Sequence, residues 1–263
     1  MTDAAPDLFA VVLAAIVGSV VGSFLNVVII RLPEGRSIVR PGSACGRCGT
    51  PVRWYDNVPV LAWLWLRGRC RACGVRLSVQ YPLVEAGTGL LAAAAVLAFG
   101  VTLDALVAFA FLAALVAVSG IDLRIREIPD AISLPGTFLG LLVSPWSGLV
   151  SSPSAALVGA LAGAGGLYLV AATYEWIRDQ EGMGLGDVKL LAMIGAVLGW
   201  EALVPTVLLA SLVGAVVGIA LTVAKGRKDL ALAIPFGPFL ALGAAVTLLL
   251  PGWWIALLAW LAG

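Results

Sequence analysis

Residues 8–30 read LFAVVLAAIVGSVVGSFLNVVII, a run without a single charged side chain. A helix of about 20 apolar residues spans the hydrocarbon core of a bilayer, so this stretch predicts a transmembrane helix. A cleaved secretory signal is a poorer interpretation, because such signals begin with a positively charged region. The segment before the run carries Asp3 and Asp7 and no Lys or Arg. We therefore expect the helix to be retained.

The rest of the chain has the same apolar character. Of its 263 residues, 61% are hydrophobic and only 12% are charged. Soluble domains average roughly 45–50% apolar and about 25% charged residues, so the bilayer must surround most of this chain. Histidine is absent. That absence excludes every mechanism that needs an imidazole base, including Ser-His-Asp and Cys-His arrangements.

The pattern of apolar segments predicts an all-α integral membrane protein with about eight transmembrane helices. The expected spans are 8–30, 82–99, 103–121, 131–149, 154–177, 187–200, 202–224 and 235–261. The sixth span is short, and Pro251-Gly252 interrupts the last. Glycines such as Gly159, Gly163 and Gly166 either let helix backbones approach closely or are simply tolerated in lipid.

The distribution of charge gives these spans a direction. Nine of the 16 basic residues lie between Arg31 and Arg76. Eight alternating helices also place the other seven on the same side: Arg124, Arg126, Arg178, Lys189, Lys225, Arg227 and Lys228. The opposite side carries only acidic charges: Asp3, Asp7, Asp104 and Glu201. By the positive-inside rule the basic side is cytoplasmic, which leaves both termini outside.

One long polar insertion interrupts the apolar pattern, and it suggests a division into three parts. Residues 1–30 form the first transmembrane helix, 31–80 a cytoplasmic insertion, and 81–263 a membrane domain of seven helices. An insertion of about 50 residues is too small to build a large apolar core, and such units usually need a metal or disulfides.

The insertion contains two C-x2-C pairs, Cys45-Gly-Arg-Cys48 and Cys70-Arg-Ala-Cys73. Two-residue spacing lets one turn present both thiolates to a tetrahedral zinc ion, so we expect a structural zinc-knuckle-like site. Disulfides or an empty site are the alternatives, and disulfides are rare in the cytoplasm. The neighbouring basic residues could bind nucleic acid. We favour contact with anionic lipid headgroups and expect no nucleic acid partner.

Two aspartates lie at the cytoplasmic edge of the predicted membrane domain. Asp122 ends the third span in SGIDLRIREIPD (119–130), and Asp187 begins the sixth in GMGLGDVKLL (182–191). Ionisable groups near lipid are costly and usually functional. Two carboxylates at one site tend to share a proton, and such a pair can activate water and protonate a leaving amine. The pair is the most plausible hydrolytic machinery in the chain.

Each aspartate also has a structural interpretation. Asp122 could be a headgroup-level charge balanced by Arg124 or Arg126. Asp187 could cap its own helix. Asp130, which follows Pro129, fits an N-cap of the fourth span.

Other residues near the two aspartates are open to two interpretations. Gly182, Gly184 and Gly186 could support a flexible approach to Asp187 or merely shape a tight turn. Lys189 could support the site, but its two-residue spacing from Asp187 fits an interface anchor better. Glu85, near the start of the second span, could be functional, although a snorkelling interfacial charge is the simpler interpretation.

GMGLGDVKLL resembles the GxGD motif of intramembrane-type aspartyl proteases, and the chain as a whole resembles the bacterial prepilin peptidases, or type IV leader peptidases. Several further segments carry that resemblance in the order of the family. They are GSFLNVVIIRLP (22–33), YDNVPVLAWLWLRGRCRACG (55–74), RLSVQYPLVE (76–85), IDLRIREIPD (121–130) and FGPFLALG (236–243).

The resemblance implies that Asp122 and Asp187 are the catalytic pair of a bacterial inner-membrane enzyme. It implies prepilin or pseudopilin substrates, with a short basic leader cut after a glycine at the cytoplasmic face. It also implies N-methylation of the new terminus with S-adenosylmethionine, although the sequence contains no independent methyl-donor motif. The zinc-type cysteines match the family as well.

Two other functional classes compete with an aspartyl endopeptidase. A transporter or channel could use the acidic residues as ion ligands, but these lie at one edge and the sequence shows no internal repeat. A membrane-anchored zinc-knuckle adaptor would not need two aspartates at one depth.

Overall fold

The computed structural model describes residues 7–178, 184–224, 234–254 and 256, and within these ranges the secondary structure is helical. Contacts divide the chain into two compact units, Met1–Ala117 (unit 1) and Val118–Gly263 (unit 2). The helices in chain order are α1 (Leu8–Arg31), η1 (Trp54–Asn57), α2 (Leu61–Trp65), α3 (Gln80–Phe99), α4 (Leu103–Ile125), α5 (Asp130–Val143), α6 (Pro153–Arg178), α7 (Leu185–Leu198), η2 (Trp200–Ala202), α8 (Leu203–Ala224) and α9 (Gly237–Leu249).

The predicted helical membrane fold is confirmed, although the count of eight spanning helices is not matched. The eight expected segments correspond to α1 and to α3 through α9. Five helices are long and apolar enough to cross a membrane: Leu8–Arg31, Gln80–Phe99, Leu103–Ile125, Pro153–Ile177 and Trp200–Ala224. The other three have 13 or 14 residues. At 1.5 Å per residue each is about 20 Å long, short of the ~30 Å core.

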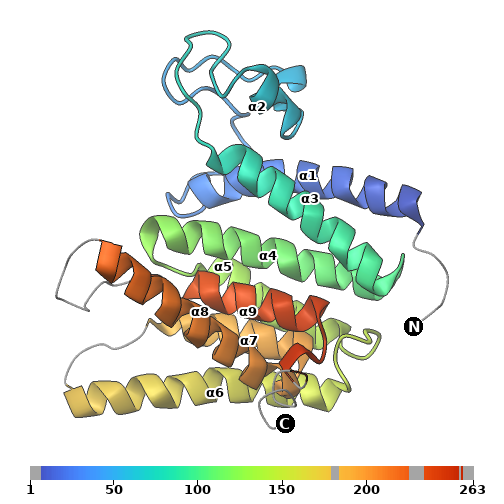
Figure 1. The fold of residues 1–263 in the computed structure, drawn as a ribbon, viewed down its shortest axis with the longest axis vertical. Helices are drawn as coiled ribbons and strands as arrows, with labels where there is room; N and C mark the ends of the chain where they lie inside the picture. Colours follow the sequence, from blue (N-terminus) through green and yellow to red (C-terminus); the bar gives the residue numbers. More distant parts are fainter. Residues whose placement is uncertain (1–6, 179–183, 225–233, 255, 257–263) are drawn as a thin grey trace. The chain divides into compact units, whose positions relative to one another are not determined.

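In unit 1, α1 and α3 pack side by side through small residues (Figure 1). A Cβ added to Gly18 would lie 2.5 Å from the Cβ of Ala92, and one added to Gly22 would lie 2.8 Å from the Cα of Glu85. The buried Asn26 side chain also joins the two helices, because its amide donates to the Tyr81 carbonyl at 3.2 Å. The polar insertion, which contains η1 and α2, connects them.

In unit 2, α7 is the central helix and packs against α5, α6 and α9. Its apolar residues are buried around nearly the whole circumference, as expected of a helix enclosed by protein. Gly159 of α6 lies against the backbone of Gly195, and Gly163 lies against Leu191, so both allow close helix packing. Gly166 has no neighbour within 4 Å of an added Cβ. For Gly166 we therefore keep the other interpretation, that the glycine is simply tolerated in lipid.

The last predicted span is interrupted at Pro251-Gly252, as its sequence suggests. Helix α9 ends at Leu249, and Gly252 has φ +87°, a left-handed conformation that favours glycine. Several predictions concern positions outside the described residues: Asp3, Gly182, Lys225, Arg227, Lys228 and most of 255–263.

Candidate active site

Asp122 lies in the last turns of α4 and is only 4% exposed. Its Oδ2 accepts a hydrogen bond from the backbone N–H of Gly237 at 3.0 Å. Just beyond it, Arg126 adopts φ +58° and donates its N–H to the Asp122 carbonyl at 2.9 Å, which ends the helix. Among the described residues neither Arg124 nor Arg126 forms an ion pair with Asp122. The alternative interpretation of Asp122 as a headgroup-level charge balanced by arginine therefore does not hold.

Gly237 makes this arrangement possible because it has no side chain. It is the first residue of α9, where free N–H groups and the helix dipole favour a negative charge. A Cβ at this position would lie 2.5 Å from Oδ2 of Asp122 and 3.1 Å from Cδ1 of Ile128. The carboxylate thus rests directly on a helix N-terminus that only glycine can supply.

Asp187 is half-buried in the first turn of α7, two residues after the helix begins. The N-cap is Gly184 and no side chain caps the helix, so Asp187 is not the cap. A Cβ on Gly186 would lie 2.9 Å from the Cβ of Ile128, so this glycine allows the turn to pack tightly. Gly184 has φ −69° and is not crowded, so its lack of a side chain serves no packing here.

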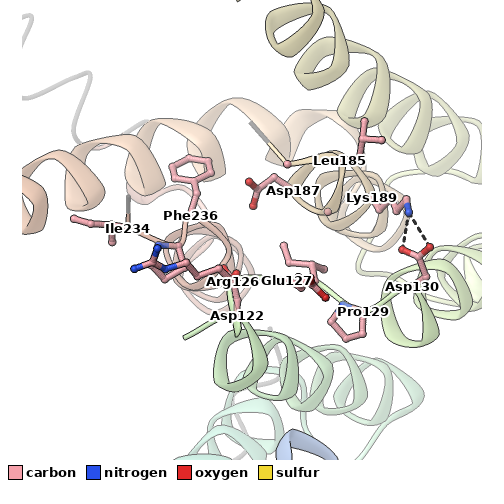
Figure 2. A pocket seen from close by; sticks show the side chains of 14 residues that line it. Asp122, Arg126, Glu127, Pro129, Asp130, Leu185, Asp187, Lys189, Ile234 and Phe236 are labelled. Carbon is pink, nitrogen blue, oxygen red and sulfur yellow. Dashed lines mark hydrogen bonds and ion pairs between the residues drawn. The ribbon is translucent and has the colours of Figure 1, made fainter. Parts of the chain in front are cut away.

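Both aspartates line one cavity of about 660 Å³ in unit 2, together with Arg126, Ile128 and Phe236 (Figure 2). The carboxylates interact electrostatically. Ile128 is buried beneath the site and packs against both Gly186 and Gly237. It thereby spaces the start of α7 from the start of α9.

Lys189 and Asp130 both line this cavity, and they form an ion pair with each other. Its Nζ lies 2.6 and 2.8 Å from the two carboxylate oxygens (Figure 2). The prediction that Asp130 caps α5 is wrong: the cap position is Pro129, without a side-chain cap, and Asp130 is the first helical residue. Its carboxylate instead forms the ion pair that joins α5 to α7.

Sequence reasoning did not single out Gly237, Ile128 or Phe236 as parts of the site. Gly237 and Phe236 belong to FGPFLALG, which resembled the last helix of a known family but gave no role to either residue. Ile128 lies between Glu127 and Pro129 and carries no chemical group that marks it. These three residues contribute through their positions in the packed structure, and only the packing of α4, α7 and α9 reveals those positions.

The four cysteines of the insertion converge in unit 1. Their sulfur atoms all lie within 4.8 Å of one another, and none forms a disulfide. Sγ of Cys45 lies 3.8 Å from Sγ of Cys73. Tetrahedral zinc with Zn–S bonds of about 2.3 Å separates its sulfur ligands by about 3.8 Å, so the cluster fits the ion.

Two matching turns build this cluster. In the first turn, the Cys45 N–H donates to the Thr50 carbonyl and the Gly49 N–H donates to the Cys45 carbonyl. In the second turn, the Cys70 N–H donates to the Val75 carbonyl and the Gly74 N–H donates to the Cys70 carbonyl. Gly49 and Gly74 both have φ +70°, where glycine is favoured. This repeat gives each C-x2-C pair the same conformation.

The thiols differ in their surroundings. Hydrogen bonds with the side chain and backbone of Thr50 lower the pKa of Cys48 to about 6, which favours the thiolate that binds metal. A hydrogen bond with the Val75 backbone lowers the pKa of Cys73, but desolvation and the other three thiols raise it to about 11. A cation among the sulfurs would relieve this crowding of negative charge.

Among the described residues, Glu85 is a second buried carboxylate besides Asp122, and it lies in unit 1. It is 8% exposed, and its Oε2 accepts the Val60 N–H at 2.7 Å. A snorkelling charge would extend toward water, so that interpretation is wrong for this residue.

Comparison with known proteins places the sequence among membrane peptidases. Residues 16–99 match the bacterial peptidase A24 N-terminal domain, and residues 109–219, which include both aspartates, match the type IV leader peptidase family. No solved structure matches the chain.

Proteins named prepilin leader peptidase/N-methyltransferase resemble the chain over most of its length. One from Burkholderia pseudomallei (strain 1026b) is 43% identical over 260 residues, which cover 89% of this chain and 84% of the relative. One from Pseudomonas putida is 40% identical over 262 residues, covering 91% and 90%. One from Aeromonas hydrophila is 41% identical over 257 residues, covering 87% of each. With this identity over nearly the whole length of both partners, the chain belongs to the type IV leader peptidase family.

Proposed function

We propose that this chain is a membrane aspartyl endopeptidase that removes the short basic leader of prepilin or pseudopilin precursors, after a glycine, at the cytoplasmic face. The observation that carries the proposal is the shared cavity of Asp122 and Asp187. Relatives at about 40% identity are named as prepilin leader peptidases. The same names include N-methyltransferase, so we also propose that the chain methylates the newly exposed N-terminus.

The geometry suggests how the two aspartates share the acid–base chemistry of the reaction. Gly237 holds one oxygen of Asp122, and in the proposed reaction the other oxygen would bind the attacking water. In the proposed reaction one carboxylate takes a proton as water attacks the carbonyl carbon. The other, protonated, first holds the carbonyl oxygen and then gives its proton to the leaving amine. The amide C–N bond breaks and one water is consumed.

The substrate's shape fits a site at the membrane edge. A precursor of this class carries an apolar helix after its leader, and that helix would lie in the bilayer beside the enzyme. Carbonyls within a helix are hydrogen-bonded and hard to attack, whereas the bond before the helix is open. In this proposal the chain lies in the bacterial inner membrane in contact with lipid, with the insertion inside and both termini outside.

Zinc and S-adenosylmethionine have separate roles in the proposal. Cys45, Cys48, Cys70 and Cys73 would hold zinc, which would fix the fold of the insertion. S-adenosylmethionine would supply the methyl group when bound. Neither takes part in the hydrolysis that we assign to Asp122 and Asp187.

The test is cleavage of a purified prepilin by the detergent-solubilised full chain, beside Asp122→Asn and Asp187→Asn. Each variant keeps the size of its side chain but loses the carboxylate's acid–base chemistry. We expect leader release to fall about a hundredfold or more in each, within the range of general acid–base catalysis. Full cleavage by either variant would refute the dyad. A matched control is Glu201→Gln, which removes an acidic group that accepts a hydrogen bond from Ser151 outside the cavity.

A further inference from the structure

The short helix α2 of the insertion exposes one apolar face. Three large side chains of this helix reach solvent: Leu61 is 65% exposed, Leu64 58% and Trp65 84%. Their spacing of three and four positions puts all three on the same side of the helix. Exposed apolar groups that gather on one face often mark an interaction site. We call this side of α2 the outer face.

The opposite side of α2 is held against the rest of unit 1. Ala62, Trp63 and the following Leu66 line a cavity of about 500 Å³, together with residues of α1 and α3. The Trp63 ring also packs on Gly68, where an added Cβ would lie 2.7 Å from Cζ2 of the indole. The helix therefore has a defined inner side, and the exposed residues stay on the outer face.

A buried carboxylate fixes the start of α2 beside a membrane-spanning helix. Glu85 lies in the second turn of α3, which is long and apolar enough to cross a membrane. Its Oε2 accepts the backbone N–H of Val60 at 2.7 Å, and α2 begins at the next residue. Figure 1 shows the insertion at the end of unit 1 where α1 ends and α3 begins. The outer face consequently lies close to the level at which α3 enters the bilayer.

The insertion is also strongly basic. Residues 31–80 contain nine arginines, no lysine and only two carboxylates. Each carboxylate pairs with one arginine, and the other seven arginines form no ion pair with a described residue. Two of these seven, Arg67 and Arg69, closely follow α2 and are exposed. A surface that joins exposed apolar groups to unpaired cations fits an anionic lipid surface.

We propose that the outer face of α2 is embedded in the headgroup region of an anionic membrane leaflet, where Leu61, Leu64 and Trp65 contact lipid and the neighbouring arginines contact lipid phosphates. Tryptophan and arginine suit this depth, because each combines an apolar part with a polar end. A helix of 5 residues would not bind a membrane alone, but α1 and α3 hold it at the surface, so a small apolar face is sufficient. The insertion then lies against the membrane rather than free in solution.

The first test is photocrosslinking of the full chain in lipid nanodiscs, which leave both membrane faces open to solvent. A diazirine amino acid of leucine-like shape is placed by codon suppression at Leu64, or at Leu66 as the matched control. Leu64 belongs to the outer face, whereas Leu66 lines the cavity. We expect lipid adducts chiefly at Leu64 and protein adducts chiefly at Leu66.

The lipid composition of the nanodiscs tests the part played by charge. One set contains phosphatidylcholine alone, and the other contains phosphatidylcholine and phosphatidylglycerol in equal parts. Attraction of a single arginine to an anionic surface changes the docking equilibrium about fivefold, so lipid adducts at Leu64 should be about fivefold or more abundant in the anionic set. The proposal is wrong if Leu64 gives no lipid adduct, if Leu66 gives as much, or if composition has no effect. An adduct of Leu64 to another protein segment or to a second copy would overturn it as well.

Leu64→Glu provides a second measurement without a photoreactive residue. The side chain is exposed, so the substitution spares the inner side of α2 but sets a carboxylate against the anionic surface. In anionic nanodiscs trypsin should cut after Arg67 and Arg69 about fivefold or more faster than in the unaltered chain, because lipid no longer covers them. Val39→Glu is the control, since Val39 is an exposed apolar residue of the insertion outside α2. An unchanged rate in Leu64→Glu, or an equal rise in Val39→Glu, would contradict the docking of α2.

Leader cleavage in the same nanodiscs separates this inference from the peptidase proposal, on which it does not depend. If prepilin is cut but Leu64 gives no lipid adduct, only the inference fails. If Leu64 crosslinks to anionic lipid as expected but no leader is released, the peptidase proposal fails while the docking of α2 stands.

Discussion

At the scale of single residues, the site depends most on a glycine that has no functional group. The Asp122 carboxylate accepts a hydrogen bond from the Gly237 N–H, and a Cβ on Gly237 would lie 2.5 Å from Oδ2. Van der Waals contact requires about 3.5 Å, so the carboxylate or α9 must shift by roughly 1 Å. Misplacement on this scale at a catalytic group costs about a hundredfold in rate.

Gly237→Ala should therefore lower leader cleavage by about a hundredfold while the helical fold is kept. Cleavage kinetics and circular dichroism on the same preparation check both parts. Gly166→Ala is the matched control, because that helical glycine has open space around it. It should leave cleavage unchanged and the fold equally or more stable. Normal activity in Gly237→Ala would contradict the placement of Asp122 against α9.

The sequence could predict the chemical groups of the site but not their spatial support. Asp122 and Asp187 stand out because carboxylates are rare in apolar segments. Gly237 acts through its backbone N–H and its lack of a side chain, and Ile128 acts by filling space between helices that are distant in sequence. Lys189 and Asp130 are 59 positions apart, so their pairing could not be read from helical spacing.

At the scale of elements, the Lys189–Asp130 ion pair joins α7 to α5 near the aspartate cavity. Both side chains are partly exposed, 34% and 55%, so solvent screening leaves the pair worth at most about 1 kcal/mol of stability. We expect the ion pair mainly to orient the start of α7, because Lys189 lies in the same first turns of α7 as Asp187.

We expect Lys189→Met and Asp130→Asn to lower cleavage by similar factors, about three- to tenfold, with little change in melting temperature. The double variant should be no slower than the slower single variant, because both remove the same contact. A double-mutant cycle of cleavage rates measures this coupling. Fully multiplicative effects would show that the two residues act independently.

The cysteine cluster was predictable in detail because its spacing encodes a local turn. Each C-x2-C-G segment forms its turn from neighbouring residues, and a 21-residue spacer is flexible enough to bring the two together. The helix lengths were less predictable. Apolar composition alone does not distinguish a spanning helix from one enclosed by other helices, as α7 is.

Metal analysis of protein purified without chelator should find one zinc per chain, and Cys48→Ser should bind it more weakly. Removing one of four thiolates leaves an incomplete tetrahedral site, and the insertion should become more sensitive to protease. Ser43→Ala is a suitable control because it alters the same segment without removing a ligand. Full zinc content in Cys48→Ser would argue against a four-cysteine site.

At the scale of the whole molecule, the proposed proteolytic residues and the candidate metal ligands lie in different units. Asp122 and Asp187 belong to unit 2, whereas the cysteines belong to unit 1. Chelation should therefore disturb the insertion much more than leader cleavage. Limited proteolysis of the insertion and cleavage kinetics on the same preparation separate the two effects. A parallel loss of leader cleavage would mean that zinc supports the proteolytic site as well.

The proposed orientation can be tested with reporter fusions in the full chain. A periplasm-active phosphatase inserted at residue 101 should be active, and the same insertion near residue 50 should be inactive. A cytoplasm-active reporter at these positions is the control and should give the opposite result. Activity of the phosphatase near residue 50 would reverse the topology and place the cysteines outside.

The short helices around the aspartates also have a consequence for the surrounding lipid. Helices α5, α7 and α9 have only 13 or 14 residues, so their apolar length falls about 10 Å short of the hydrocarbon core. Where α5 and α9 meet lipid, the bilayer must thin or the helices must draw headgroups and water inward. Hydrophobic mismatch would then bring water to a proteolytic site within an otherwise dry membrane. Reconstitution into vesicles of increasing acyl-chain length should reveal that dependence as a falling rate of cleavage.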